Sequence, residues 1–196
     1  MIVVDVEASG IDPRKHSLLS IGAVDFENPD YQFYEECRVW EGAKIMKEAL
    51  KVNGFTKEQA TDPKKQSVEE LIEKFLYWAK QCNTKILAGH NTHFDVAFLQ
   101  TSCERAKLNW PFSFRIVDLH SVGYAHVLRR GKKIPMNRGK SCLNSEFMLK
   151  YVGLDAEPKP HHALTGAKME TEAFARLFYR KGLLKEYEQF LVPEYL

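Results

Sequence analysis

The apolar and polar positions along the chain follow two spacings, one typical of strands and one typical of helices. Nearly continuous or alternating apolar stretches predict strands at 2–8, 17–26, 31–40, 85–90 and 114–122. Apolar positions repeated every three or four residues predict helices at 67–82, 92–108, 141–153 and 162–182, with a further helical segment after residue 122. The Asn-Pro-Asp sequence at 28–30 predicts the turn of a hairpin between the second and third strands.

The order of these elements predicts the fold. Three strands in succession, then strands alternating with helices, indicate an α/β fold in which helices flank a mixed β-sheet. The chain has 196 residues, which is enough for one domain with a substantial core, and neither a repeat nor a linker divides it. We therefore expect a single domain over residues 1–196.

Composition narrows the class of protein without fixing its function. Hydrophobic residues make up 44% and charged residues 28% of the chain, and a net charge of +2 neither requires nor excludes a nucleic-acid partner. The four cysteines form no Cys-x-x-Cys pair, so we expect reduced thiols in a cytoplasmic protein rather than a zinc site or disulfides. No apolar run reaches the ~20 residues that cross a bilayer, and the N-terminal sequence lacks the basic region of a signal peptide, so no membrane partner is expected.

Three acidic residues stand out against apolar surroundings. Asp5 and Glu7 are two positions apart on the first predicted strand, so their side chains share one face. Two neighbouring carboxylates repel unless a cation or protons neutralise them, and oxygen ligands suit Mg²⁺ or Mn²⁺; the alternative is a solvated strand end. Asp95 lies in the first turns of the predicted helix at 92–108, with Asn91 as its expected cap, and alone would suit a helix N-terminus.

Together, three ordered motifs carry a family resemblance. They are Asp-x-Glu at 5–7, Gly-His-Asn-x-x-Phe-Asp-x-x-Phe-Leu at 89–99 and His-x-Ala-Leu at 161–164. They resemble the motifs of the DEDDh exonuclease superfamily, which comprises proofreading 3′–5′ exonucleases and ribonuclease T-like nucleases on a ribonuclease H-like fold. The likeness extends through the stretches between the motifs, such as SLLSIGAVDF, IVDLHSV and FMLKYVGL, and so covers roughly the whole chain.

The resemblance implies hydrolysis of phosphodiester bonds with two divalent ions, Mg²⁺ or Mn²⁺. By this likeness Asp5 would bridge both ions, while Glu7 would bind one ion and hold the 3′ end. Asp95 would hold the second ion, partly through water, and His161 would be the general base. The implied activity is a 3′–5′ exonuclease that acts on single-stranded DNA or RNA ends and releases nucleoside 5′-monophosphates.

One motif position departs from the family pattern, which places an aspartate five residues after the histidine where this chain has Gly166. Three explanations remain open. Glu170, one turn further along the helix, could substitute, although it could equally be an ordinary exposed residue. The acid could have been lost naturally, leaving a nucleic-acid-binding module with impaired catalysis, or Gly166 could be an introduced substitution.

Two further segments are candidates for substrate binding. The basic stretch at 128–140 has two glycines, a proline and no acid, and it could contact a phosphate backbone or be a solvated loop. Its first basic residues are Arg129, Arg130, Lys132 and Lys133, followed by Arg138 and Lys140. By resemblance, the residues after Asp-x-Glu would contact the terminal nucleotide, namely Ala8, Ser9, Gly10 and Ile11. The sequence does not distinguish DNA from RNA, and no separate tail indicates docking on a polymerase.

Overall fold

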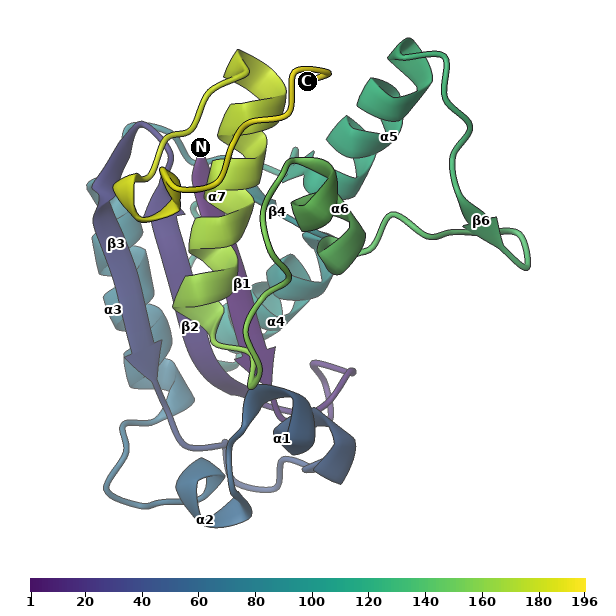
Figure 1. Ribbon diagram of the computed structural model, residues 1–196. Coiled ribbons are helices and arrows are strands. Elements are labelled where there is room, and N and C mark those ends of the chain that lie inside the picture. The colour runs from purple at the N-terminus through teal and green to yellow at the C-terminus, as the bar shows by residue number, and fades with distance from the viewer.

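A mixed five-stranded sheet forms the centre of the computed structural model, which describes residues 1–196 (Figure 1). Its spatial order is β3-β2-β1-β4-β5. The first three strands are antiparallel, and β4 and β5 run parallel to β1. The strands are β1 (Ile2–Ala8), β2 (Leu18–Asp25), β3 (Asn28–Glu36), β4 (Leu87–Gly89) and β5 (Val117–Asp118).

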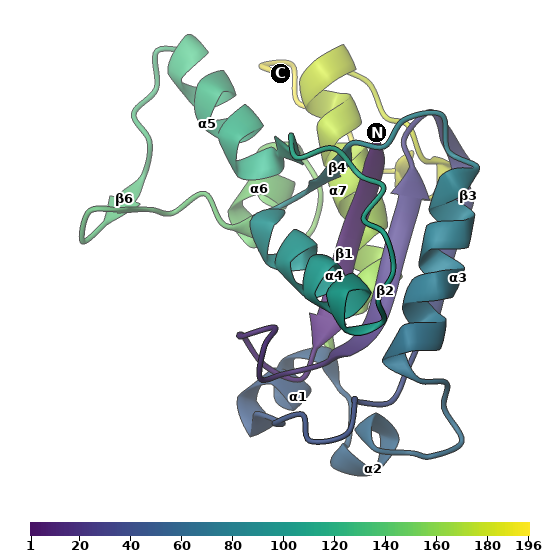
Figure 2. The same ribbon diagram turned by 180° about the vertical axis from the view of Figure 1, so that it is seen from behind.

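Helices cover both faces of the sheet. One face carries α3 (Val68–Lys80) and α4 (His93–Arg105), which lie in front of the sheet in Figure 2. The other face carries α5 (Leu119–Arg129), α6 (Ser145–Tyr151) and α7 (Ala163–Tyr179). Shorter elements are α1 (Lys47–Asn53), α2 (Lys57–Ala60), the 3-10 helix η1 (Lys185–Tyr187) and a two-stranded hairpin of β6 (Met136–Asn137) and β7 (Lys140–Ser141).

The alternation of β1 divides the core in two. Ile2, Val4 and Val6 pack with α3 and α4, whereas Val3 packs with α5, α6 and α7. Because side chains two residues apart share a face, Asp5 and Glu7 point to the same side as Val3, toward α7. The fold thus directs both acids of the first motif at the helix that carries the last motif.

The predicted α/β fold with a mixed sheet and flanking helices is confirmed. Several boundaries were wrong. The hairpin turns at residues 26–27, so Asn-Pro-Asp lies at the start of β3, and that strand ends at Glu36 rather than at residue 40. Only Val117–Asp118 is a strand in the predicted stretch 114–122, because the Asp118 side chain accepts a hydrogen bond from the Ser121 amide and starts α5 there.

Two local predictions about loops also failed. Asn91 does not cap α4; it adopts a left-handed conformation (φ 60°), and Thr92 precedes the first helical residue. The basic stretch at 128–140 is not one irregular loop, because it includes the end of α5 and the turn of the β6–β7 hairpin. All four cysteines are free thiols, and no helix is long and apolar enough to span a membrane.

A buried ion pair fixes the C-terminal segment to α7. Arg176 and Glu172 are one turn apart, their side chains are at most 1% exposed, and Nε lies 2.8 Å from Oε1. The Glu172 carboxylate also accepts hydrogen bonds from the Leu183 and Leu184 amides. The Arg176 guanidinium donates to backbone carbonyls of Val152, Gly153, Tyr187, Phe190 and Leu191. Both charges are therefore fully partnered.

Candidate active site

Close packing of α7 on β2 positions the last motif over the first. Gly22 of β2 lies directly under the start of α7, and a Cβ there would be 2.1 Å from the backbone carbon of Ala163. Only glycine permits this approach. The N-terminal end of α7 consequently lies beside the strand that carries Asp5 and Glu7.

Asp95 reaches the same region from α4. Its side chain belongs to a residue only 4% exposed, and Oδ1 accepts a hydrogen bond of 3.0 Å from the Val6 amide of β1. Val6 lies between Asp5 and Glu7, so the second motif is tied to the backbone of the first. His90, just before α4, has a structural hydrogen bond between its Nε2 and the Leu143 carbonyl (2.9 Å).

Glu170 is a buried residue of α7, only 6% exposed, so the interpretation as an ordinary exposed helix residue was wrong. Its Oε2 accepts a hydrogen bond of 3.1 Å from the His90 amide at the end of β4. A Cβ at Gly89 would lie 3.3 Å from the same oxygen, so β4 approaches this carboxyl closely. The helix thus delivers an acid to the interior, one turn beyond Gly166.

Burial and mutual repulsion raise the pKa values of these carboxyls. The pKa of Asp5 is raised well above its usual value, first by burial and then by the charges of Glu170 and Asp95. Burial likewise raises the pKa values of Asp95 and Glu170, and their hydrogen bonds from backbone amides partly lower them again. Burial and the charge of Glu157 raise the pKa of Glu7 to about 8, opposed by a hydrogen bond from Asn53. No cationic side chain is among the groups that shift the pKa values of Asp5, Asp95 and Glu170. Glu172 differs from them, because it is paired with Arg176.

The donor set suits a hard divalent cation, since it consists of carboxylate oxygens whose repulsion a cation would relieve. The carboxylates do not converge on one point, and no three of these acids are spaced as metal ligands. Each has a different neighbour: Asp95 bonds to Val6, Glu170 bonds to His90, and the tip of Asp5 lies over Gly166. Ion binding would therefore require rotation of these side chains.

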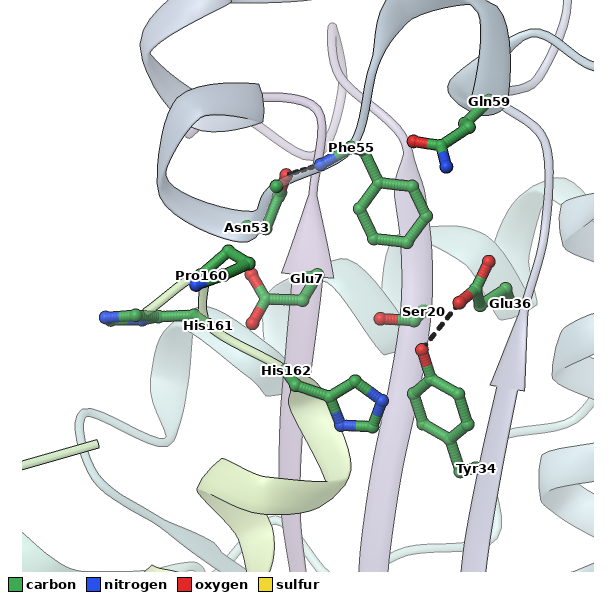
Figure 3. A pocket seen from close by; sticks show the side chains of 11 residues that line it. Glu7, Ser20, Tyr34, Glu36, Asn53, Phe55, Gln59, Pro160, His161 and His162 are labelled. Carbon is green, nitrogen blue, oxygen red and sulfur yellow. Dashed lines mark hydrogen bonds between the residues drawn. The ribbon is translucent and has the colours of Figure 1, made fainter. Parts of the chain in front are cut away.

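The two histidines diverge at the start of α7 (Figure 3). His162 stacks on Tyr34 of β3 with ring centroids 4.2 Å apart. His161 has a side chain 37% exposed, and its Nδ1 lies 3.5 Å from Oε2 of Glu157. Its backbone amide donates to the Val52 carbonyl, which ties it to α1. His162 is the more exposed residue of the pair, but its ring is engaged in the stack on Tyr34, whereas the partly exposed His161 ring lies beside Glu157.

Glu157 is a site residue that sequence reasoning missed. Its Oε1 accepts a hydrogen bond of 3.3 Å from the His162 amide, so one carboxyl contacts both members of the histidine pair. Burial raises its pKa, and its charge also acts on Glu7, Asp5 and Glu170. Its only sequence signal was an acid four residues before His161 in a proline-containing loop, which no motif distinguishes.

Two cavities meet at His161. One of about 220 Å³ is lined by Glu7, Ser20, Tyr34, Asn53, Phe55 and His162, and Figure 3 shows the Glu7 carboxylate directed toward Pro160 and His161. The other, of about 520 Å³, lies toward α6 and is lined by Lys51, Asn144, Ser145, Glu146, Glu157 and Lys159. Of Asp5, Glu7, Asp95 and Glu170, which we call the acidic cluster, only Glu7 lines one of these cavities, so the cluster borders a cavity at Glu7, beside His161.

The residues after Asp-x-Glu differ in accessibility. Ala8, Ser9 and Gly10 are buried, and the Ser9 hydroxyl already accepts from the Ser17 amide and donates to the Lys44 carbonyl. A Cβ at Gly10 would clash with the His16 ring. The missing side chain at Gly10 therefore makes room for this ring and not for a nucleotide. Ile11 is 72% exposed. Of this group, Ile11 alone presents a side chain that a base could contact.

The structure does not bring the first basic residues to the acidic cluster. Arg129 and Arg130 line a cavity with Leu177, Phe178 and Arg180, at the C-terminal end of α7. The 17 residues of α7 span about 25 Å at ~1.5 Å per residue, and His161 precedes the opposite end. Lys132 and Lys133 are exposed in the segment that leads from α5 to the projecting β6–β7 hairpin (Figure 1).

Comparison with known proteins decides the family. The sequence model of the RNase T exonuclease family matches residues 2–174, which is most of the chain. The chain belongs to this exonuclease family. It is therefore a nuclease-type hydrolase by family, and its resemblance to the DEDDh exonucleases is confirmed.

Individual relatives agree with this assignment. The exonuclease chain is 32% identical over 123 residues to ribonuclease T of Yersinia enterocolitica and 29% identical to that of Escherichia coli K12. Each match covers 55% of the chain and 55% of the relative, so the chain spans about half the length of the curated relatives it matches.

Solved structures share the fold. The nuclease domain of 3′hExo, a DEDDh family member bound to rAMP, superimposes with a TM-score of 0.70 at 18% identity, over 94% of each chain. E. coli exonuclease I in complex with a dA16 oligonucleotide gives a TM-score of 0.68 at 18% identity, over 90% of this chain and 40% of the other. At such identities the likeness supports the fold of this exonuclease.

Proposed function

We propose that this protein is a divalent-metal-dependent 3′–5′ exonuclease that removes nucleoside 5′-monophosphates from single-stranded DNA or RNA. The observation that carries the proposal is the burial of Glu170 beside Asp5 and Asp95. With Glu7, Glu170 brings the number of carboxyl groups to four, although Gly166 stands where the family has an aspartate. E. coli exonuclease I was solved with a dA16 oligonucleotide and 3′hExo with rAMP, which supports a nucleic-acid substrate.

In the proposed site, Asp5, Glu7, Asp95 and Glu170 would hold Mg²⁺ or Mn²⁺ ions once their side chains rotate toward one another. When bound, such ions lower the pKa of an attacking water and stabilise both oxygens of an in-line displacement. The charges of Glu170, Asp95 and Glu7 all raise the pKa of Asp5, so Asp5 neighbours the other three acids and would suit a shared ligand. Glu7 lines the cavity beside His161 and is the acid placed to orient the 3′ end.

His161 is the proposed general base. It is partly exposed and lines both cavities, so a water molecule in either one can reach its ring. Oε2 of Glu157 lies 3.5 Å from Nδ1, where it would orient the ring and leave Nε2 to accept a proton. The exposed Ile11 and the Phe55 ring in the wall of the smaller cavity are the proposed apolar contacts for the terminal base.

The second candidate is a nucleic-acid-binding module with impaired catalysis on the same fold. The observation in its favour is that the carboxylates face separate partners and not one point. In both cases we propose one exonuclease-type domain over residues 1–196 and a cytoplasmic location, for which the free cysteines are the support.

An end-labelled single strand separates the candidates. The protein is incubated with the labelled oligonucleotide in Mg²⁺, in Mn²⁺ and in EDTA, with Asp95→Asn as the control. The Asn side chain keeps an oxygen for the Val6 amide while removing the charge. We expect mononucleotides from the 3′ end with either metal, none in EDTA and at least about 100-fold less from Asp95→Asn. Binding without products in both metals would establish the second candidate instead.

A further inference from the structure

A cavity far from the acidic cluster collects positive charge. It has a volume of about 310 Å³ and lies between the ends of α5 and α7 and the C-terminal residues, which come together at one end of the molecule in Figure 1. Its polar lining consists of His126, Arg129, Arg130, Arg180 and Tyr195, and Leu177, Phe178 and Leu196 complete it. We call it the distal arginine pocket. No aspartate or glutamate side chain lines it.

The three guanidinium groups of the pocket lack ionic partners. None of Arg129, Arg130 and Arg180 forms an ion pair. Their charges add to burial in lowering the pKa of His126, which places all three around that ring. Like charges gathered without an acidic side chain among them cost free energy, and an anion in the pocket would lower this cost.

One of the arginines is held in place from several sides. Arg130 donates to the Tyr151 hydroxyl (3.2 Å) and stacks over the Tyr195 ring at 3.9 Å, while the Tyr195 hydroxyl bonds to the Tyr151 carbonyl. This guanidinium is therefore preorganised, whereas Arg129 and Arg180 are exposed and free to turn toward a ligand.

Aromatic rings border the same pocket. Phe178 and Tyr195 line it and are 42% and 43% exposed. A positively charged groove with accessible aromatic rings is the combination that binds single-stranded nucleic acid, because phosphates meet the charges and bases stack on the rings. A pocket for a small free anion would not need two exposed aromatic rings in its wall.

We propose that the distal arginine pocket binds backbone phosphates of the same strand whose 3′ end lies at the acidic cluster. This inference rests on the proposed function. The two sites are about 25 Å apart along α7, which a stacked strand at ~3.4 Å per nucleotide spans with about seven nucleotides, and an extended strand with fewer.

A basic segment of the chain connects the two sites. Residues 129–145 lead from the distal arginine pocket to Asn144 and Ser145 in the larger cavity at His161. This segment contains six basic residues and no aspartate or glutamate. The exposed Lys132, Lys133, Arg138 and Lys140 lie between its ends, on the part that carries the projecting β6–β7 hairpin, and supply further positive charge for contact with phosphates (Figure 1).

The test compares oligonucleotides that can and cannot reach the distal arginine pocket. Binding of a tetranucleotide and of a strand of about 15 nucleotides is measured by fluorescence anisotropy in EDTA, over a range of salt concentrations. The variant is Arg129→Gln combined with Arg180→Gln. The control is Arg115→Gln. Arg115 is also exposed and forms no ion pair, but it lies outside the pocket.

We expect the variant to weaken binding of the long strand at least about fivefold and to reduce its logarithmic salt slope by about 1.4, the value for two lost phosphate contacts. Its tetranucleotide binding should match that of the parent. Equal long-strand affinities of the variant and Arg115→Gln would overturn the inference. The inference would also be overturned if the variant lost thermal stability but kept its affinity for the long strand. The two arginines would then only stabilise the C-terminal ends of their helices, where positive charge offsets the helix dipole.

Hydrolysis separates this inference from the function on which it rests. If the parent degrades both oligonucleotides but the variant binds the long one normally, the inference fails and the proposed function stands. If the parent degrades neither and the variant still loses long-strand affinity, the distal arginine pocket stands as a binding site while the exonuclease proposal fails.

Discussion

The carboxylate of Asp5 occupies the space that a side chain at Gly166 would need. A Cβ on Gly166 would lie 2.0 Å from Oδ2 of Asp5 and 3.0 Å from its Cγ, well inside van der Waals contact. The glycine costs the helix about 1 kcal/mol relative to alanine. In return, α7 can lie against the first acid of the site, and Glu170 can reach the interior one turn later.

The first prediction concerns this contact. Restoring the family acid with Gly166→Asp should lower nuclease activity about tenfold or more, because the new Cβ displaces Asp5 and small displacements of reacting groups are costly. Gly166→Ala is the matched control, since it adds the same Cβ without a charge. Initial rates on an end-labelled single strand measure both. Activity of Gly166→Asp above that of the parent would show that the site lacks an acid and that Glu170 does not supply it.

Glu170→Gln tests the substitute acid directly. The glutamine oxygen can still accept from the His90 amide, so the fold should persist and Tm should be unchanged or higher once a buried carboxyl is removed. Activity should fall at least about 100-fold, since even an outer partner of a metal ligand commonly contributes 10- to 100-fold. Glu186→Gln, an exposed acid outside the cluster, should retain full activity. Near-parental rates for Glu170→Gln would remove it from the site.

The two adjacent histidines provide a matched pair of variants. His161→Ala should lose about 10²- to 10⁴-fold in kcat, the usual contribution of a general base. His162→Ala removes only the stack on Tyr34 and should cost less than about tenfold. The pH–rate profiles of both variants check the assignment, which would be reversed if His162→Ala were the more damaging change.

Stability of the metal-free protein should depend on pH through the acidic cluster. Glu7 has its pKa raised from 4.5 to about 8, so between these values the folded protein holds a proton that the unfolded chain has released. Stability from this group is therefore full below about pH 4.5 and is lost as pH rises toward about 8. Thermal unfolding in EDTA should show a Tm at least about 3 °C lower at the upper end of this window.

Divalent ions should reverse this loss, because a bound cation replaces the proton among the carboxylates. The rise in Tm on adding Mg²⁺ or Mn²⁺ should be larger near pH 8 than near pH 5. Glu7→Gln is the control, since it has no proton to lose at this position and should show a flatter pH dependence. A Tm that rises with pH in EDTA would contradict the electrostatic description of the site.

Much of the fold was predictable from the spacing of apolar residues. Long elements such as α3 and β1 combine strong periodicity with clear ends, and they were placed within two residues. The failures came where a side-chain contact, not periodicity, sets the boundary. Asp118 caps α5 and cuts the predicted strand at 114–122 short, and the short helices α1 and α2 bury too little to leave an apolar stripe.

The site was predictable only in part, because its motifs report residue types and not directions. Sequence placed Asp5, Glu7 and Asp95 together, and the structure brings them to one region. It could not tell that Glu170 points inward, since its place at the flank of the apolar stripe fits either direction. The sequence also did not show that Arg129 and Arg130 lie far from these acids. They follow the direction of α5 and lie at the C-terminal end of α7.

The last prediction concerns the buried ion pair that holds the C-terminal segment. Arg176→Met should lower the free energy of unfolding by about 3–5 kcal/mol, because it leaves Glu172 charged and buried without its partner and frees five backbone carbonyls. Lys168→Met on the same helix removes only the surface pair with Glu186 and should cost at most about 1 kcal/mol. Urea unfolding measures both. A cost for Arg176→Met near that of Lys168→Met would mean that the segment containing Tyr195 is held mainly by its apolar contacts.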